Sequence, residues 1–149
     1  KKMKYTFNDL DDLIEARSHQ SIAAIFRNQG EEKFRLYEKQ YLKNFLDKDK
    51  HILSVGAGAI NSGTLEISQS FKYRIWLKTS IDMLIKRYSE QEKNRPLLYN
   101  TNNIKGILTD LYNTRKDFYR NCSNIVIDTN GRTINQIINE SITKINALS

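Results

Sequence analysis

The sequence is poor in several residue types that constrain a fold. Its one cysteine, Cys122, excludes an internal disulfide and fits a reducing compartment. Its one proline forces few bends, and its two histidines, His19 and His51, lack the neighbours of a zinc site. No apolar run approaches the roughly 20 residues of a membrane span, and the first residues form no apolar signal segment. We therefore expect one cytoplasmic domain over residues 1–149, without a membrane partner.

Acidic residues are outnumbered, since 24 Lys and Arg face 17 Asp and Glu and leave a net charge of +7. Such an excess attracts anions of several kinds, including nucleic acid, phosphates and carboxylated metabolites. Nucleic-acid-binding proteins cluster their basic residues and interleave aromatic ones, whereas the basic residues here are scattered. We therefore expect no nucleic-acid partner. We further expect a monomer that acts on a small-molecule substrate.

Short β-rich runs alternate with longer helical ones. We predict strands at 4–7, 51–55, 73–77 and 124–127. We predict helices at 21–29, 31–46, 80–92 and 104–120, and a last one from Thr133. Gly30 separates the first two helices, and the isoleucines of the last helix form one apolar stripe that we expect in the core. Strands that alternate with helices predict a three-layer α/β protein, a parallel sheet with helices on both faces.

Two carboxylates, Asp9 and Asp11, fall where the first predicted strand ends. They are typical of turn residues that cap a helix. The alternative is a metal and polyol site, because two ionised carboxylates need a cation or hydroxyl donors to satisfy them. The local pattern leaves both readings open.

Arg35 and Glu38 share one helix face, with Phe26 and Phe34 as apolar neighbours. This spacing fits a surface ion pair, and equally a partly dry pocket that holds a carboxylate or hydroxyl. The small residues Gly56-Ala57-Gly58 follow the second strand, where α/β sheets bind ligands, although a plain tight turn explains them too.

Two further arginines lie in the second half of the chain. Arg95 falls in a polar stretch, 89–103, that we expect to be a mobile loop able to close over a phosphate. Arg115 lies in a helix four residues before Tyr119, and its planar fork suits a carboxylate. Each arginine alone is equally compatible with an exposed side chain.

Several short motifs follow one another in a fixed order along the chain. Phe-x-Asp-x-Asp-x-x-Ile-Glu is followed by Ser-Ile-x-x-Ile-Phe, Gly-Glu-x-x-Phe-Arg-x-x-Glu, a Gly-rich strand end, Arg-Pro-Leu-Leu and Arg-x-x-x-Tyr. Together they resemble the shikimate kinases over about residues 7–138. This resemblance implies a P-loop kinase fold of the nucleoside-monophosphate-kinase type, with strand order 2-3-1-4-5. It also implies transfer of the γ-phosphoryl of ATP to the 3-hydroxyl of shikimate, with Mg²⁺, in the biosynthesis of chorismate and the aromatic amino acids.

The resemblance assigns roles to individual residues. Asp11 would hold the shikimate hydroxyls and help to deprotonate the attacking one, and Arg95 would be the lid arginine that meets the transferring phosphoryl group. The remaining substrate-binding residues would be Arg35, Arg115, Gly56, Ala57, Gly58, Phe26, Phe34 and Glu38. Asp9 and Ser54 would support Mg²⁺, and Arg87 and Arg132 would flank the adenine. The substrate-binding helices would span 12–50 and the lid 89–103.

Two departures from the family pattern stand out. Ala57 replaces the middle glycine of the usual three, which would cost affinity if its φ were positive. No Gly-x-x-x-x-Gly-Lys-Ser/Thr occurs, and we expect the first, central strand and this phosphate loop to precede Lys1 in a longer chain. The alternatives are a non-catalytic relative that lost its phosphate loop, and another small-molecule P-loop kinase such as a gluconate kinase.

Overall fold

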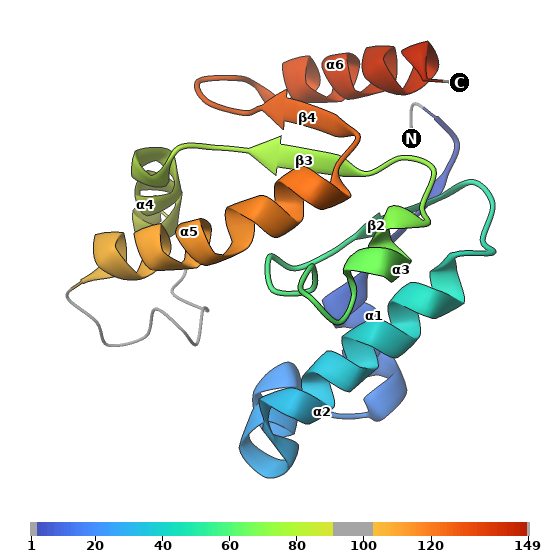
Figure 1. Cartoon of the computed structure of the whole chain (residues 1–149), viewed down its shortest axis with the longest axis vertical. Helices are drawn as coiled ribbons and strands as arrows, with labels where there is room; N and C mark the ends of the chain where they lie inside the picture. The colour runs from blue at the N-terminus through green and yellow to red at the C-terminus, as the bar shows by residue number, and fades with distance from the viewer. Residues whose placement is uncertain (1–2, 91–102, 149) are drawn as a thin grey trace. The chain divides into compact units, whose positions relative to one another are not determined.

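The computed structural model describes residues 3–90 and 103–148, with the side chains of Ser89 and Glu90 left aside. The chain divides into two compact units, Lys1–Phe71 and Lys72–Ser149, and each is described by itself. Figure 1 labels their elements. Both units are small parallel α/β structures, as the alternation of strands and helices predicts.

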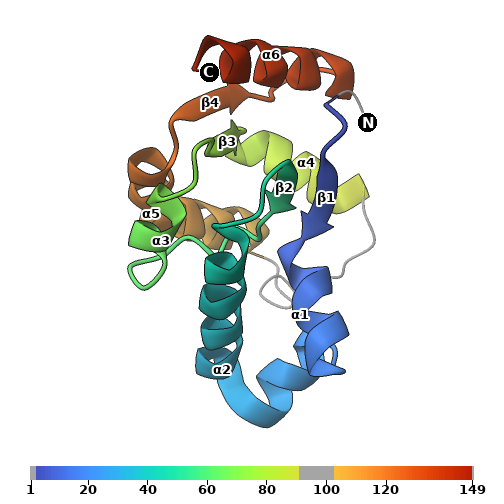
Figure 2. The ribbon, with the colours of Figure 1, turned by 90° about the vertical axis from the view of Figure 1, so that its right-hand side faces the viewer.

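The first unit has two parallel strands joined by helices. Strand β1 (Thr6–Asp9) leads into helix α1 (Leu10–Ser18) and helix α2 (Ile22–Phe45), and strand β2 (His51–Ser54) returns beside β1. Helices α1 and α2 pack against each other, as Figure 2 shows. A short helix α3 (Leu65–Gln69), which the sequence pattern did not predict, follows the β2 loop.

The core of this unit follows from helical spacing. Leu10 and Ile14 lie one turn apart on α1, both fully buried, and meet Ile25, Phe34 and Leu42 from α2, together with Ala59. The break expected at Gly30 is confirmed, because this residue has φ 82° inside an otherwise helical run. Helix α2 is therefore two helical segments joined at a kink.

The second unit repeats the parallel pairing. Strand β3 (Ile75–Lys78), helix α4 (Ile81–Glu90), helix α5 (Ile104–Cys122), strand β4 (Ile125–Asp128) and helix α6 (Ile134–Ala147) follow in order, and β3 pairs with β4. On β4, Ile125 and Ile127 are buried while Val126 between them is exposed, the period of two that a strand requires. The Trp76 ring lies 5.6 Å from the ring of Tyr119 on α5.

One predicted feature of α6 is confirmed and another is wrong. Thr133 and Gln136 form the capping box that their spacing predicts. The apolar stripe is not a buried core, however, because no described residue of α6 is buried and Ile134 is 77% exposed. The helix packs on β4, and a sheet of two strands covers only part of a wide stripe.

Candidate functional site

Asp9 and Asp11 do not share one face of a strand. Strand β1 ends at Asp9, and Asp11 already belongs to the first turn of α1. Asp9 caps this helix, since its Oδ1 accepts a hydrogen bond from the Asp11 amide at 2.9 Å. The capping interpretation is therefore confirmed for Asp9, while the side chain of Asp11 stays half-buried and makes no part of the cap.

The environment of Asp11 raises the pKa of its carboxyl group above the ordinary value. Burial raises the pKa of Asp11, and the carboxylates of Asp9, Glu15 and Asp12 raise it further, while the Arg35 guanidinium acts in the opposite direction. A carboxylate with a raised pKa is a better proton acceptor than an exposed one. This arrangement suits a group that accepts hydrogen bonds from hydroxyls or takes up a proton.

Arg35 lies between two carboxylates. Its Nη1 donates to Glu38 Oε2 at 2.7 Å, and its Nε and Nη2 donate to Glu31 Oε1 at 3.1 and 2.7 Å. Glu38 is 2% exposed, and burial raises its pKa although the hydrogen bond from Arg35 opposes this. For Arg35 itself burial lowers the pKa, but the hydrogen bonds to both carboxylates outweigh it, so the guanidinium stays charged.

Sequence reasoning identified Glu38 as the partner of Arg35 and missed Glu31. The signal was present, because Glu31 precedes Arg35 by four residues and such pairs meet on a helix face. Because Gly30 predicts a break, Glu31 falls at the start of a predicted helix, where the helix dipole already explains an acidic residue. Glu31 is nevertheless a direct partner of the arginine.

The Gly56-Ala57-Gly58 turn lies next to both Asp11 and Arg35. A Cβ placed on Gly56 would lie 3.7 Å from Asp11 Oδ2, and one on Gly58 would lie 2.8 Å from Arg35 Nη1. Asp11 and Arg35 therefore face the same turn, two residues apart. The φ of Ala57 is not positive, so its methyl group carries no backbone strain and the expected cost of this departure does not arise.

The other residues of this unit lie as follows. The Phe26 and Phe34 ring centroids are 5.0 Å apart, and the Phe34 ring lies 5.4 Å from Arg35 Cζ. Ser54 ends β2 directly opposite Asp9, so both side chains belong to the carboxyl ends of parallel strands. An open hollow of about 580 Å³ beside Arg35 is lined by Glu31, Lys39 and Thr64, and Asp11 is not part of its wall.

Oxygen ligands for a metal are few. In the described part of the chain no group of three His, Cys, Asp or Glu residues is placed to hold a metal ion. Asp9 and Ser54 are adjacent oxygen donors, and Mg²⁺ usually keeps several waters and takes only one or two protein ligands. The pair fits a magnesium site in which water would supply most of the oxygens.

Four predicted site residues belong to the second unit: Arg87, Arg95, Arg115 and Arg132. Arg87 Nη2 donates to the Thr129 carbonyl at 3.4 Å. Burial raises the pKa of Tyr119, whereas the charge of Arg115 and its hydrogen bond to Tyr119 oppose this rise. Arg115 therefore lies beside the Tyr119 side chain, one helical turn away. Arg95 lies outside the described residues.

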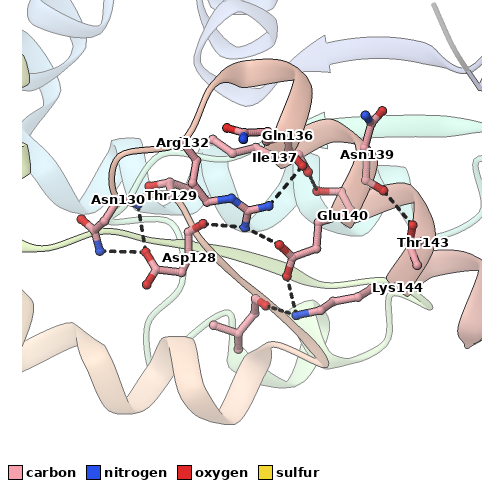
Figure 3. Close-up of polar contacts among 12 residues, drawn as sticks. Asp128, Thr129, Asn130, Arg132, Gln136, Ile137, Asn139, Glu140, Thr143 and Lys144 are labelled. Carbon is pink, nitrogen blue, oxygen red and sulfur yellow. Dashed lines mark hydrogen bonds and ion pairs between the residues drawn. The ribbon is translucent and has the colours of Figure 1, made fainter.

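Arg132 is held in a polar cluster, which Figure 3 shows. Its guanidinium donates to the carbonyls of Asp128 and Gln136 at 3.0 and 3.3 Å and pairs with Glu140. Glu140 also accepts from Lys144 at 2.8 Å, and these two cations hold its pKa below the usual range. The cluster ties the turn after β4 to helix α6, so Arg132 has a defined position there.

The fold and the site indicate a class of protein. A carboxylate after one parallel strand, a small-residue turn after the next and a guanidinium from the intervening helix are typical of α/β proteins that bind small polar ligands. No helix among residues 3–90 and 103–148 is long and apolar enough to cross a bilayer.

Comparison with known proteins identifies the family. The shikimate kinase family model matches residues 1–146. A shikimate kinase of Burkholderia lata is 32% identical, with 93% of this chain and 75% of the relative covered, and one of Enterococcus faecalis is 35% identical, with 93% and 82% covered. The chain belongs to the shikimate kinase family, whose members are ATP-dependent kinases.

Solved structures agree with this assignment. The structure of an Acinetobacter baumannii shikimate kinase in complex with shikimate has a TM-score of 0.87 at 28% identity, with 96% of this chain and 79% of that chain covered. A Bacteroides thetaiotaomicron shikimate kinase has a TM-score of 0.83 at 21% identity, with 99% and 85% covered, and supports the fold alone. The predicted α/β fold and family are confirmed.

Proposed function

We propose that the protein transfers the γ-phosphoryl group of ATP to the 3-hydroxyl of shikimate. The observation that carries this proposal is that Asp11 and Arg35 face one turn, Gly56 to Gly58, in a chain of the shikimate kinase family. A cyclic polyol with one carboxylate needs both an acceptor for hydroxyls and a cation for the carboxylate. Asp11 lies beside one end of the turn and Arg35 beside the other.

Substrate recognition follows from these contacts. Arg35 binds the shikimate carboxylate, with Glu38 fixing its orientation and the Ala57 amide adding a contact. Phe26 and Phe34 form an apolar wall beside it, and the segment 12–50 supplies these side chains. Asp11 accepts the hydroxyls and takes the proton of the attacking one, which its raised pKa supports.

Charge neutralisation is the second requirement. Phosphoryl transfer depends on positioning and on neutralising the charge of the phosphates. Asp9 and Ser54 hold Mg²⁺ through water, and the ion, when bound, supplies positive charge to the phosphate oxygens. Arg87 and Arg132 flank the adenine, a proposal that the fixed position of Arg132 supports.

Two arginines complete the proposed site. Arg115 adds a second cation for the shikimate carboxylate, since two guanidinium groups against one anion give bidentate specificity. Arg95, in the proposed lid 89–103, meets the transferring phosphoryl group and excludes water on closure. For Arg95 the proposal rests on the family motif Arg-Pro-Leu-Leu alone.

The finer fold remains part of this proposal. We infer a single three-layer domain with strand order 2-3-1-4-5, whose first, central strand and phosphate loop are not among these 149 residues. Each described sheet has two strands, and this supports an additional strand because both sheets leave edges unpaired.

The proposal includes the localisation and the oligomeric state of the enzyme. We propose that it works in the cytoplasm as a monomer, on small molecules of the aromatic amino acid pathway. The single cysteine supports a reducing compartment.

A coupled ADP-release assay tests the activity. The purified protein is incubated with ATP, Mg²⁺ and shikimate. A parallel reaction contains gluconate in place of shikimate. We expect ADP release that depends on shikimate. Shikimate binding without ADP release identifies a non-catalytic relative, and release with gluconate alone identifies a different small-molecule kinase.

A further inference from the structure

The guanidinium of Arg35 has two places where a carboxylate can bind through two hydrogen bonds. One is the Nη1/Nη2 end, and the other is the Nε/Nη2 edge. At the end, Nη1 already donates to the buried Glu38. Gly58 also lies against this end, because a Cβ there would be 2.8 Å from Nη1 and 2.9 Å from Nη2. An incoming carboxylate is therefore left with the Nε/Nη2 edge.

That edge is occupied by Glu31. Its Oε1 accepts from both Nε and Nη2 of Arg35, at 3.1 and 2.7 Å. The side chain of Glu31 is 60% exposed, whereas that of Glu38 is 2% exposed, so the two carboxylates differ in how easily they can leave. With both in place, the three groups carry a net negative charge, and another carboxylate is repelled.

We propose that Glu31 occupies the binding position of the substrate carboxylate in the substrate-free protein and is a specificity-determining residue. Glu38 keeps the guanidinium in place, while Glu31 yields its position to the carboxylate and turns into solvent, for which the adjoining hollow gives room. This inference rests on the proposed function, since it takes the incoming anion to be the carboxylate of shikimate. Glu31 thus lowers the affinity of the site and favours ligands whose carboxylate can displace it.

The variant Glu31→Gln tests this inference, with Glu32→Gln as the matched control. The control removes the same charge from the neighbouring exposed residue, which makes no ion pair with Arg35. Calorimetric titration gives the Kd for shikimate and for its methyl ester, which lacks the anionic carboxylate. Exposed ion pairs are worth little, so we expect Glu31→Gln to bind shikimate about two- to fivefold more tightly. The Kd of the methyl ester and the KM for ATP stay unchanged.

The outcomes separate this inference from the proposed function. A wild-type protein that binds no shikimate overturns the proposed function and this inference with it. A wild-type protein that binds shikimate while Glu31→Gln binds no more tightly than Glu32→Gln overturns the inference alone. An equal gain for the methyl ester also overturns it, because the carboxylate would then play no part.

Discussion

Gly58→Ala is the sharpest test of the geometry around Arg35. The new Cβ would lie 2.8 Å from Nη1 and 2.9 Å from Nη2 of the guanidinium, closer than real Cβ atoms approach other atoms, and 3.1 Å from Cζ. The φ of Gly58 is outside the left-handed region, so alanine fits the backbone. The three atoms nearest to the new Cβ all belong to Arg35, so the steric effect of this substitution acts first on that side chain.

The size of the effect depends on how firmly Arg35 is held. A free arginine would swing away at little cost, but this one donates three hydrogen bonds to Glu31 and Glu38. Moving it weakens the bond to Glu38, which is 2% exposed and would be left a poorly paired charge. Hydrogen bonds to charged groups contribute about 1.5–3 kcal/mol, and overpacking costs about 1–3 kcal/mol. We expect a loss of about 1–3 kcal/mol in the free energy of unfolding and about tenfold weaker shikimate binding.

Gly56→Ala is the matched control from the same turn. Its Cβ would lie 3.7 and 3.8 Å from the two carboxylate oxygens of Asp11, which is ordinary van der Waals contact. Urea denaturation gives the stability of both variants, and calorimetric titration gives their Kd for shikimate. We expect Gly56→Ala to keep wild-type stability within about 0.5 kcal/mol. A Gly58→Ala variant as stable as Gly56→Ala, with unchanged shikimate affinity, would refute the reasoning.

Three further predictions concern the charged residues. The pKa of Asp11 lies above its ordinary value of 3.8 in the folded protein, so stability falls as the pH rises from 3.8 through the raised pKa and stays lower above it. Asp11→Asn should abolish activity, because Asp11 accepts the proton of the attacking hydroxyl. The same variant should have a higher urea midpoint at pH 7, and this gain in stability should vanish below pH 3.8. A urea midpoint that falls at pH 7 contradicts the prediction. Asp9→Asn should keep the helix cap and its stability, whereas Asp9→Ala should lose about 1 kcal/mol in denaturation experiments. Both should lose Mg²⁺-dependent activity, and full activity in Asp9→Asn would exclude a metal role. Arg115→Ala should raise the Kd for shikimate far more than the Kd for ATP in titrations, and equal losses would refute its assigned role.

Local patterns determined much of the fold. The alternation of short β-branched runs with helical runs predicted parallel strands in an α/β fold, and Gly30 marked the break in α2 because a residue with φ 82° favours glycine. The capping box at Thr133 was equally readable. Each of these features depends on residues close together in the chain, so their conformational preferences can be predicted from the sequence.

The sequence named candidate site residues but not how they are connected. The ordered motifs named Asp11, Arg35 and the glycine turn through their resemblance to the shikimate kinases, because each pattern alone left another explanation open. Only the tertiary structure decided that Asp11 and Arg35 face one turn, and that Gly58 lies against the Arg35 guanidinium. These facts depend on where β1, β2 and α2 come together, and such packing depends on side chains far apart in the chain.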